Sequence, residues 1–285
     1  MTGLAPVLRD ATATLFAVSA TPRLDAELLM AHALGMDRST MLLRARDLVV
    51  PDVFAGLLAR RIGHEPVAYI TGVQAFWDLE LRVTPDVLIP RADSETLLDI
   101  ATDWFGSDQM PARIADLGTG SGALLLAALS IFPASAGYGI DSSMAALGVA
   151  RDNADRLGFA DRAVFMQRDW ASAGWNANLG QFDLILCNPP YIEDGHALEV
   201  MVSAYEPHSA LFAGADGLDD YHVLIPQLPS LLNSGGVAIF EIGYNQAEAV
   251  SELGAKAGFS TELRHDLAGN PRAIRFSLGI EEYND

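Results

Sequence analysis

The sequence predicts an α/β protein whose main part is a doubly wound, mostly parallel sheet, preceded by a small helical domain and a β-hairpin linker. From about residue 92 onward, strand-like apolar runs alternate with glycine-containing turns and helix-like segments. This alternation is typical of a parallel sheet covered by helices on both faces. Over residues 1–75 the periodicity is helical and no strand alternation occurs. We therefore expect three parts: residues 1–75, 76–91 and 92–285.

The first part reads as a bundle of short amphipathic helices. TPRLDAELLMAHALG, residues 21–35, places Leu24, Leu28 and Ala31 on one predicted face and ends at a glycine. VFAGLLARRIGHEP, residues 53–66, repeats the pattern and ends in glycine and proline. We expect a helical domain over residues 1–75.

The linker changes to a period of two. In FWDLELRVTPDVLIPR, residues 76–91, Leu79, Leu81 and Val83 alternate with polar or charged residues. Pro85 and Asp86 then supply turn chemistry before the apolar residues 87–89. This pattern predicts a β-hairpin turning at Pro85 and Asp86.

Seven segments in residues 92–285 are predicted to be strands. They are RIADL, GYGID, AVFMQRD, FDLILCN, GVAIFEIG, TELRHDL and RAIRFSLG. Helix-like segments such as ALLLAALSIF and SSMAALGVARDNADRLG lie between them. The single cysteine, Cys187, falls in the fourth run, so we expect it to pack in a strand rather than act as a catalytic thiol.

A glycine-rich loop follows the first of these strands. In ADLGTGSGA, residues 115–123, Gly118, Gly120 and Gly122 allow a tight turn and close approach of a ligand to the main chain. Asp116, at the strand end, can accept hydrogen bonds from a cationic or hydroxylated ligand. The loop also fits the dinucleotide pattern G-x-G-x-x-A. A plain tight turn remains an alternative.

Acidic and aromatic residues end the next two strands. Asp141 is placed to accept both ribose hydroxyls of an adenosyl group, or alternatively to cap the helix that follows. Asp169 can accept from an adenine amino group and Trp170 can pack on its ring, although Trp170 can equally cover the sheet edge. These residues predict a nucleoside site but do not distinguish NAD from S-adenosylmethionine.

The stretch FDLILCNPPY, residues 182–191, favours the second cofactor. Asn188 follows a strand, at the carboxyl edge where open α/β sheets bind ligands. Pro189 and Pro190 stiffen the loop and remove backbone donors. Asn188 Oδ1 and the Pro189 carbonyl can receive the two hydrogens of a planar –NH₂ group, and Tyr191 offers it a flat face. This arrangement aims a nitrogen at an electrophile such as a sulfonium methyl; a nicotinamide has no use for it.

These motifs together resemble class I S-adenosylmethionine-dependent methyltransferases acting on planar nitrogen. More closely, the chain resembles the HemK/PrmC family, peptide chain release factor glutamine N5-methyltransferases. The resemblance extends to GHEPVAYITGVQAFW (63–77), LIPRADSETL (88–97), EPHSALFAGADGLDDY (206–221) and EIGYNQ (241–246). The family usually has Pro and Thr where this chain has Ala92 and Ser94.

The resemblance implies a seven-stranded, Rossmann-like methyltransferase sheet. It implies that the chain methylates the glutamine of the Gly-Gly-Gln motif in class I peptide chain release factors and forms S-adenosyl-L-homocysteine. It also implies that the N-terminal domain helps grip the release factor. Expected catalytic residues are Asn188, Pro189, Pro190 and Tyr191. Expected cofactor contacts are Asp116, Gly118, Thr119, Gly120, Ser121, Gly122, Asp141, Asp169, Trp170 and Asn188.

Composition limits the alternatives. An adenine-N6 DNA methyltransferase would use the same Asn-Pro-Pro-Tyr chemistry on a flipped base. Such an enzyme needs a cationic groove, and the formal charge of −19 argues against one. An NAD(P)-dependent dehydrogenase or a non-enzymatic regulator that binds S-adenosylmethionine would have no need for the predicted acceptors of an –NH₂ group in residues 188–191.

The remaining expectations concern environment and lesser residues. The chain shows neither a membrane-spanning run nor a signal pattern, so we expect a cytoplasmic monomer with no direct nucleic-acid partner. The histidines show no metal spacing, and we expect no metal. Glu206 and Glu241 fit structural roles, with pocket lining or contact with a basic partner residue as alternatives. We expect Arg91 to hold the hairpin in place.

Overall fold

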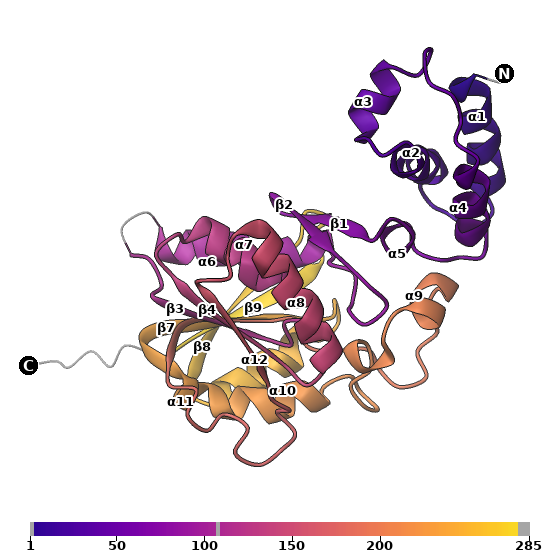
Figure 1. The fold of residues 1–285 in the computed structure, drawn as a ribbon. Helices are drawn as coiled ribbons and strands as arrows, with labels where there is room; N and C mark the ends of the chain where they lie inside the picture. Colours follow the sequence, from indigo (N-terminus) through magenta and orange to yellow (C-terminus); the bar gives the residue numbers. More distant parts are fainter. Residues whose placement is uncertain (1–2, 107–108, 279–285) are drawn as a thin grey trace, which may run out of the picture. The chain divides into compact units, whose positions relative to one another are not determined.

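The computed structural model describes residues 3–106 and 109–278 of the 285-residue chain. It divides into two compact units, Met1–Val73 with Leu198–Glu206, and Gln74–Ala197 with Pro207–Asp285. Figure 1 shows the ribbon coloured along the sequence. The assignment of Leu198–Glu206 to the first unit differs from the predicted domain boundaries, which placed this segment in the domain with the sheet. Within the described residues, no helix is long and apolar enough to cross a membrane.

The smaller unit is mainly helical over its described residues. Its helices are α1 (Leu4–Leu15), α2 (Pro22–Ala33), α3 (Arg38–Leu43), α4 (Val53–Ile62), α5 (Val67–Thr71) and α9 (Val200–Tyr205). Leu15, Leu29, Met41 and Phe54 lie in its buried core. The segment carrying α9 is tied to this unit by a hydrogen bond of 2.8 Å from the Tyr205 hydroxyl to the carbonyl of Gly63. Because α9 buries no side chain of its own, a hydrophobic pattern could not reveal this placement.

Helix α2 buries only part of the predicted face: Ala31 is buried, whereas Leu28 is half-buried. Leu24 is 40 % exposed, whereas Asp25 and Glu27 are buried beside the apolar core residues. Arg61 donates to Asp25 at 2.7 Å, and Arg23 donates to Glu27 at 2.8 Å. Buried carboxylates are tolerated when they are paired and hydrogen-bonded. The prediction was wrong for Leu24, because the buried side of the helix includes the ion-paired Asp25 and Glu27.

The β-hairpin also lies earlier than predicted. Its strands are β1 (Val73–Phe76) and β2 (Leu79–Arg82), joined at Trp77, which has a φ of 55°. The Trp77 backbone N–H donates to Glu95 Oε1 at 2.8 Å, which holds this unusual turn. Residues 83–91 form no strand, although Val87 and Ile89 are buried.

The larger unit contains a seven-stranded sheet in the order β5-β4-β3-β6-β7-β9-β8. The strands are β3 (Arg113–Leu117), β4 (Ala136–Asp141), β5 (Ala163–Gln167), β6 (Phe182–Cys187), β7 (Leu232–Glu241), β8 (Phe259–His265) and β9 (Pro271–Leu278). Strands β3 to β7 pair in parallel, whereas β9 is antiparallel to both β7 and β8. This arrangement confirms the predicted mostly parallel sheet; Gly279, the last residue of the final predicted strand, lies outside the described residues.

Helices cover both faces of the sheet, as predicted. One hydrophobic layer joins α6 (Glu95–Phe105) and α7 (Ala123–Ile131) to inward residues such as Ile114 and Leu184. The other joins α10 (Asp219–Leu224), α11 (Leu228–Leu231) and α12 (Ala247–Lys256) to the alternate residues Ala115 and Ile185. Cys187 is buried in this second layer, which confirms its predicted packing role.

The strand order reverses beside β3, which places β4 on one side and β6 on the other. Ligands of open α/β sheets bind outside the carboxyl ends of the strands at such a reversal. Here β3 leads into the glycine-rich loop, β4 ends at Asp141, and β6 leads into Asn188. The fold therefore gathers the separately predicted site segments at one edge.

Candidate active site

Two cavities open at this edge. A cavity of about 290 Å³ is lined by Asp141, Ser143, Trp170 and Pro190, among others. A smaller cavity of about 60 Å³ is lined by Phe76, Arg91, Ser94, Asp116, Thr119 and Ser121, among others. Gly118, Gly120 and Asn188 line both. Residues of the predicted glycine loop and the predicted Asn188 therefore line both cavities.

The glycines of the loop have backbone conformations that other residues rarely adopt. Gly118, Gly120 and Gly122 have φ values of 76°, 54° and 83°. A Cβ atom on Gly118 would also lie 3.2 Å from Cη2 of Trp170. A side chain at position 118 would therefore be strained by the backbone conformation and would require Trp170 to shift.

Asp116 has one satisfied and one unsatisfied oxygen. It is 1 % exposed, and its Oδ2 accepts from the Thr119 hydroxyl at 2.7 Å. Its Oδ1 is buried and has no hydrogen-bond partner among the described residues. Burial raises the pKa of Asp116 to about 7. A buried carboxylate oxygen without a donor is costly, so Asp116 is suited to receive a donor from a ligand.

Asp141 braces the loop and faces the larger cavity. Its Oδ2 accepts from the Gly120 backbone N–H at 2.9 Å, and its Oδ1 accepts from that of Ser143 at 2.8 Å. The helix-cap alternative for Asp141 is wrong, because Ser143 caps α8 (Met144–Leu157) by accepting from the Ala146 N–H. Burial raises the pKa of Asp141. Each carboxylate oxygen keeps lone-pair capacity for a further donor.

The structure separates Trp170 from Asp169. Trp170 lines the larger cavity and donates from Nε1 to Asp220 Oδ1 at 2.6 Å. Asp169 is exposed, and its oxygens accept from the Ala171 N–H at 2.9 Å and the Ser172 hydroxyl at 3.2 Å. Asp169 is not among the residues that line either cavity. Asp220, the partner of Trp170, was not anticipated; its only sequence signal is an acidic pair at a helix start.

The Asn-Pro-Pro-Tyr segment lies directly after β6. Asn188 Nδ2 donates to Ser94 Oγ at 3.1 Å, and the Tyr191 hydroxyl donates to Glu241 Oε1 at 3.2 Å. Pro189 is buried, whereas Pro190 lines the larger cavity. Hydrogen bonds therefore hold both polar side chains of this segment in place.

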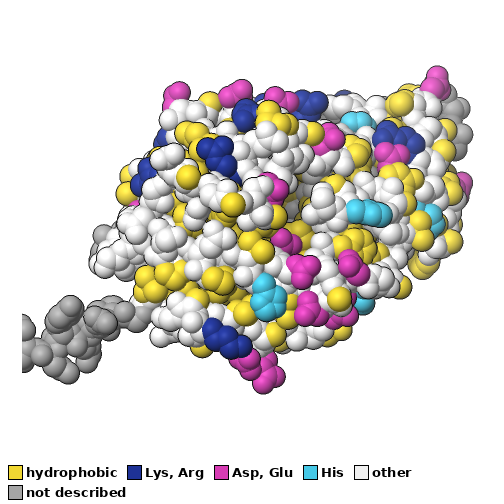
Figure 2. All heavy atoms as spheres, turned by 90° about the horizontal axis from the view of Figure 1, so that it is seen from below, with side chains coloured by type: hydrophobic (Ala, Val, Ile, Leu, Met, Phe, Trp, Pro, Cys, Tyr) yellow, Lys and Arg dark blue, Asp and Glu magenta, His cyan; other side chains and the backbone are white. Residues whose placement is uncertain are grey.

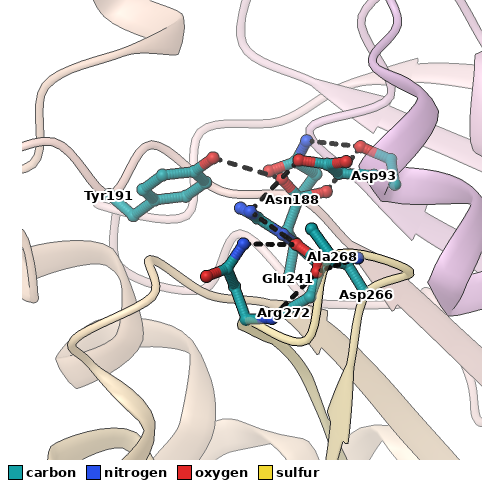
Figure 3. Close-up of polar contacts among 9 residues, drawn as sticks. Asp93, Asn188, Tyr191, Glu241, Asp266, Ala268 and Arg272 are labelled. Carbon is teal, nitrogen blue, oxygen red and sulfur yellow. Dashed lines mark hydrogen bonds and ion pairs between the residues drawn. The ribbon is translucent and has the colours of Figure 1, made fainter.

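A buried polar cluster lies behind Asn188 and Tyr191 (Figure 3). Glu241, at the end of β7, is 1 % exposed and accepts from the Ser94 hydroxyl at 2.5 Å as well as from Tyr191. Nearby, Arg272 pairs with Asp266 at 3.0 Å and with Asp93 at 3.1 Å. Burial raises the pKa of Glu241 to about 7. Ser94 and Arg272 were not predicted as site residues, and Glu241 was predicted to be structural.

The remaining uncertain residues lie in different environments. Arg91 lines the smaller cavity. Glu206 is buried within the segment Leu198–Glu206 of the helical unit. In the part of the chain that the structure describes, no group of three or more His, Cys, Asp or Glu side chains is arranged to hold a metal ion.

Comparison with known proteins establishes the relationship. Residues 6–72 match the PrmC N-terminal domain, and residues 110–263 match a methyltransferase domain. A release factor glutamine methyltransferase of Rhodospirillum rubrum is 42 % identical over 259 residues, covering 89 % of this chain and 78 % of that protein. One from Bradyrhizobium diazoefficiens is 42 % identical over 262 residues, covering 88 % and 86 %.

A solved structure supports the same fold. A methyltransferase from Pyrococcus furiosus superposes with a TM-score of 0.54 at 19 % identity, covering 79 % of this chain and all of that one. Identity this low bears on the fold alone, and the methyltransferase sheet is confirmed. The resemblance predicted from the motifs is confirmed by the full-length relatives: the chain belongs to the release factor glutamine methyltransferase family.

Proposed function

We propose that this chain transfers the methyl group of S-adenosyl-L-methionine to the side-chain amide nitrogen of the glutamine in the Gly-Gly-Gln motif of class I peptide chain release factors. The supporting observation is the position of Asn188, which lines both cavities while its Nδ2 is engaged by Ser94. Its Oδ1 is then the polar atom left to accept from a substrate amide. The names of the relatives from Rhodospirillum rubrum and Bradyrhizobium diazoefficiens point to the same substrate.

The residues around the cavities fit the cofactor. In the larger cavity, Asp141 can accept from ribose hydroxyls and Trp170 offers an aromatic surface to adenine. In the smaller one, the unpaired Oδ1 of Asp116 can accept from the cofactor's ammonium group. The loop from Gly118 through Thr119, Gly120 and Ser121 to Gly122 lets the ligand approach the main chain. When bound, S-adenosylmethionine supplies an electrophilic methyl group on a sulfonium.

The Asn-Pro-Pro-Tyr segment prepares the acceptor nitrogen. An amide nitrogen is a poor nucleophile because its lone pair is delocalised into the carbonyl. Asn188 Oδ1 and the Pro189 carbonyl accept from its two hydrogens, which raises electron density on nitrogen. Pro190 limits the mobility of the segment, and Tyr191 supports the flat amide. Well-oriented reactants can be worth roughly 7 to 11 kcal/mol, so alignment supplies much of the rate.

The charge of the chain favours a protein substrate over a nucleic acid. There are 18 Lys and Arg against 37 Asp and Glu residues. On the face drawn in Figure 2, the basic side chains are scattered rather than gathered into a stripe. A DNA methyltransferase requires a surface that neutralises phosphates. We expect the chain to act as a monomer in the cytoplasm, with the helical unit contributing to release factor binding.

The proposal is tested by offering radiolabelled S-adenosylmethionine to the full chain with three acceptors: a release factor carrying Gly-Gly-Gln, the same factor with that glutamine replaced, and unmethylated DNA. We expect label on the intact factor alone. Label on DNA and none on the factor would refute the proposed substrate. Label on the factor whose glutamine has been replaced would show that the acceptor atom lies elsewhere in that protein.

A further inference from the structure

We infer that Ser94 and Glu241 are positioning residues that fix which end of the Asn188 side-chain amide faces the substrate. This inference rests on the proposed function, because it concerns how Asn188 comes to present an oxygen rather than an NH₂ group. Ser94 comes from the short 3₁₀ turn Ala92–Ser94 before α6, and Glu241 ends β7. Neither lies within the Asn-Pro-Pro-Tyr segment.

The direction of the hydrogen bonds sets the orientation. When Glu241 is ionised, as it is above its pKa of about 7, it can only accept, so the Ser94 hydroxyl donates its single proton to Glu241 Oε2, 2.5 Å away. Ser94 Oγ can then act toward Asn188 only as an acceptor. The atom of Asn188 that lies 3.1 Å from Ser94 Oγ must therefore be Nδ2. Oδ1 is left on the other side of the same amide plane.

The charge that imposes this direction is itself held in place. Glu241 Oε1 accepts from the Tyr191 hydroxyl at 3.2 Å, and the backbone carbonyl of Glu241 accepts from Tyr221 at 2.7 Å. Arg272 lies close enough to stabilise the carboxylate electrostatically. Buried hydrogen-bonded networks of this kind resist rearrangement when every member is satisfied. The Asn188 amide therefore has one preferred orientation.

Loss of this constraint would have a specific consequence. Without Ser94, the Asn188 amide can rotate by half a turn and present Nδ2, a donor, to the substrate. A donor cannot pair with the –NH₂ of glutamine, but it can pair with a carboxylate. The cluster is thus predicted to set the preference for glutamine over glutamate at the acceptor position.

The test uses the full chain with S-adenosylhomocysteine bound and measures affinity for two factors, one carrying Gly-Gly-Gln and one with glutamate in place of that glutamine. For the wild type we expect the glutamine factor to bind about 10- to 100-fold more tightly. In Ser94→Ala the ratio of the affinity for the glutamine factor to that for the glutamate factor should fall close to one. In Ser94→Thr, which keeps the hydroxyl, it should remain at the wild-type value.

Glu241→Gln provides a second variant. Glutamine can place either its oxygen or its NH₂ group against Ser94, so it no longer imposes one direction, and the ratio should fall part of the way. If Ser94 and Glu241 had a purely structural role, replacing them would weaken the binding of both factors equally and leave the ratio of the two affinities unchanged. Retention of the wild-type ratio in both Ser94→Ala and Glu241→Gln would overturn the inference, as would a wild type that shows no preference. Failure of the proposed function is seen separately, as absence of methyl transfer by the wild type to the glutamine factor.

Discussion

Replacing Asn188 with alanine should lower the rate constant of methyl transfer about 1,000-fold while leaving most of the affinity for S-adenosylmethionine. The variant loses Oδ1, one of the two proposed acceptors for the substrate –NH₂ group. Removing a single preorganised hydrogen-bonding group from a reaction site typically costs 100- to 1,000-fold in rate, and loss of alignment adds to it. The cofactor keeps its contacts with the glycine loop, Asp116 and Asp141, none of which the substitution changes. Single-turnover transfer to the release factor measures the rate, and calorimetry measures cofactor binding.

A matched control is Asn176→Ala. Asn176 lies in the loop before β6 and is not among the residues that line either cavity. Its replacement should leave both the rate and the affinity unchanged. An Asn188→Ala variant that transfers methyl groups at the wild-type rate would remove Asn188 from the chemistry and, with it, the proposed use of the Asn-Pro-Pro-Tyr segment.

Replacing Asp141 with asparagine should weaken S-adenosylmethionine binding about 100-fold, because it damages two interactions at once. The wild-type carboxylate accepts from the N–H groups of Gly120 and Ser143 with separate oxygens. Asparagine has one oxygen, so its NH₂ group must face one of these donors. The glycine loop loses its brace, and the ribose hydroxyls lose an acceptor. Equilibrium titration with the cofactor measures the effect.

Asp169→Asn separates the two aspartates that the sequence placed in the nucleoside site. Asp169 is exposed and closes its own turn at Ala171 and Ser172, so its replacement should not change the affinity for the cofactor. Equal weakening by both substitutions would mean that the adenosyl group lies nearer to Asp169 than the cavities indicate. An unaffected Asp141→Asn variant would exclude Asp141 from ribose binding.

Much of the sheet could be predicted because its information is local. The central strands β3 and β6 are largely buried apolar runs of five and six residues, and the parallel arrangement follows from the helices between the strands. The hairpin was misplaced for an equally local reason. Its turn contains Trp77 in a conformation usually adopted by glycine or asparagine, whereas the predicted turn at Pro85 has typical turn residues but no following strand.

The candidate site could be predicted where a strand leads into one of its residues, and it could not be predicted where segments distant in the sequence meet. Asp116 lies near the end of β3, Asp141 ends β4 and Asn188 directly follows β6, so the rule that ligands bind at the carboxyl edge of the sheet predicts their positions. Ser94 and Glu241 are 147 residues apart in sequence. Trp170 and Asp220 are separated by 50 residues. No periodicity or spacing links such pairs, and they become neighbours only when the sheet forms. Asp169 was predicted to bind adenine because it lies just after a strand, but its side chain accepts hydrogen bonds from Ala171 and Ser172 in its own turn.

The most direct measurement is a crystal structure of the full chain with S-adenosyl-L-homocysteine. We predict that its adenosyl group lies in the larger cavity beside Asp141 and Trp170, and that its amino-acid end lies in the smaller cavity beside Asp116. The sulfur should then lie next to Asn188. A product molecule bound with its sulfur remote from Asn188 would contradict the idea that this asparagine presents the acceptor nitrogen to the methyl donor.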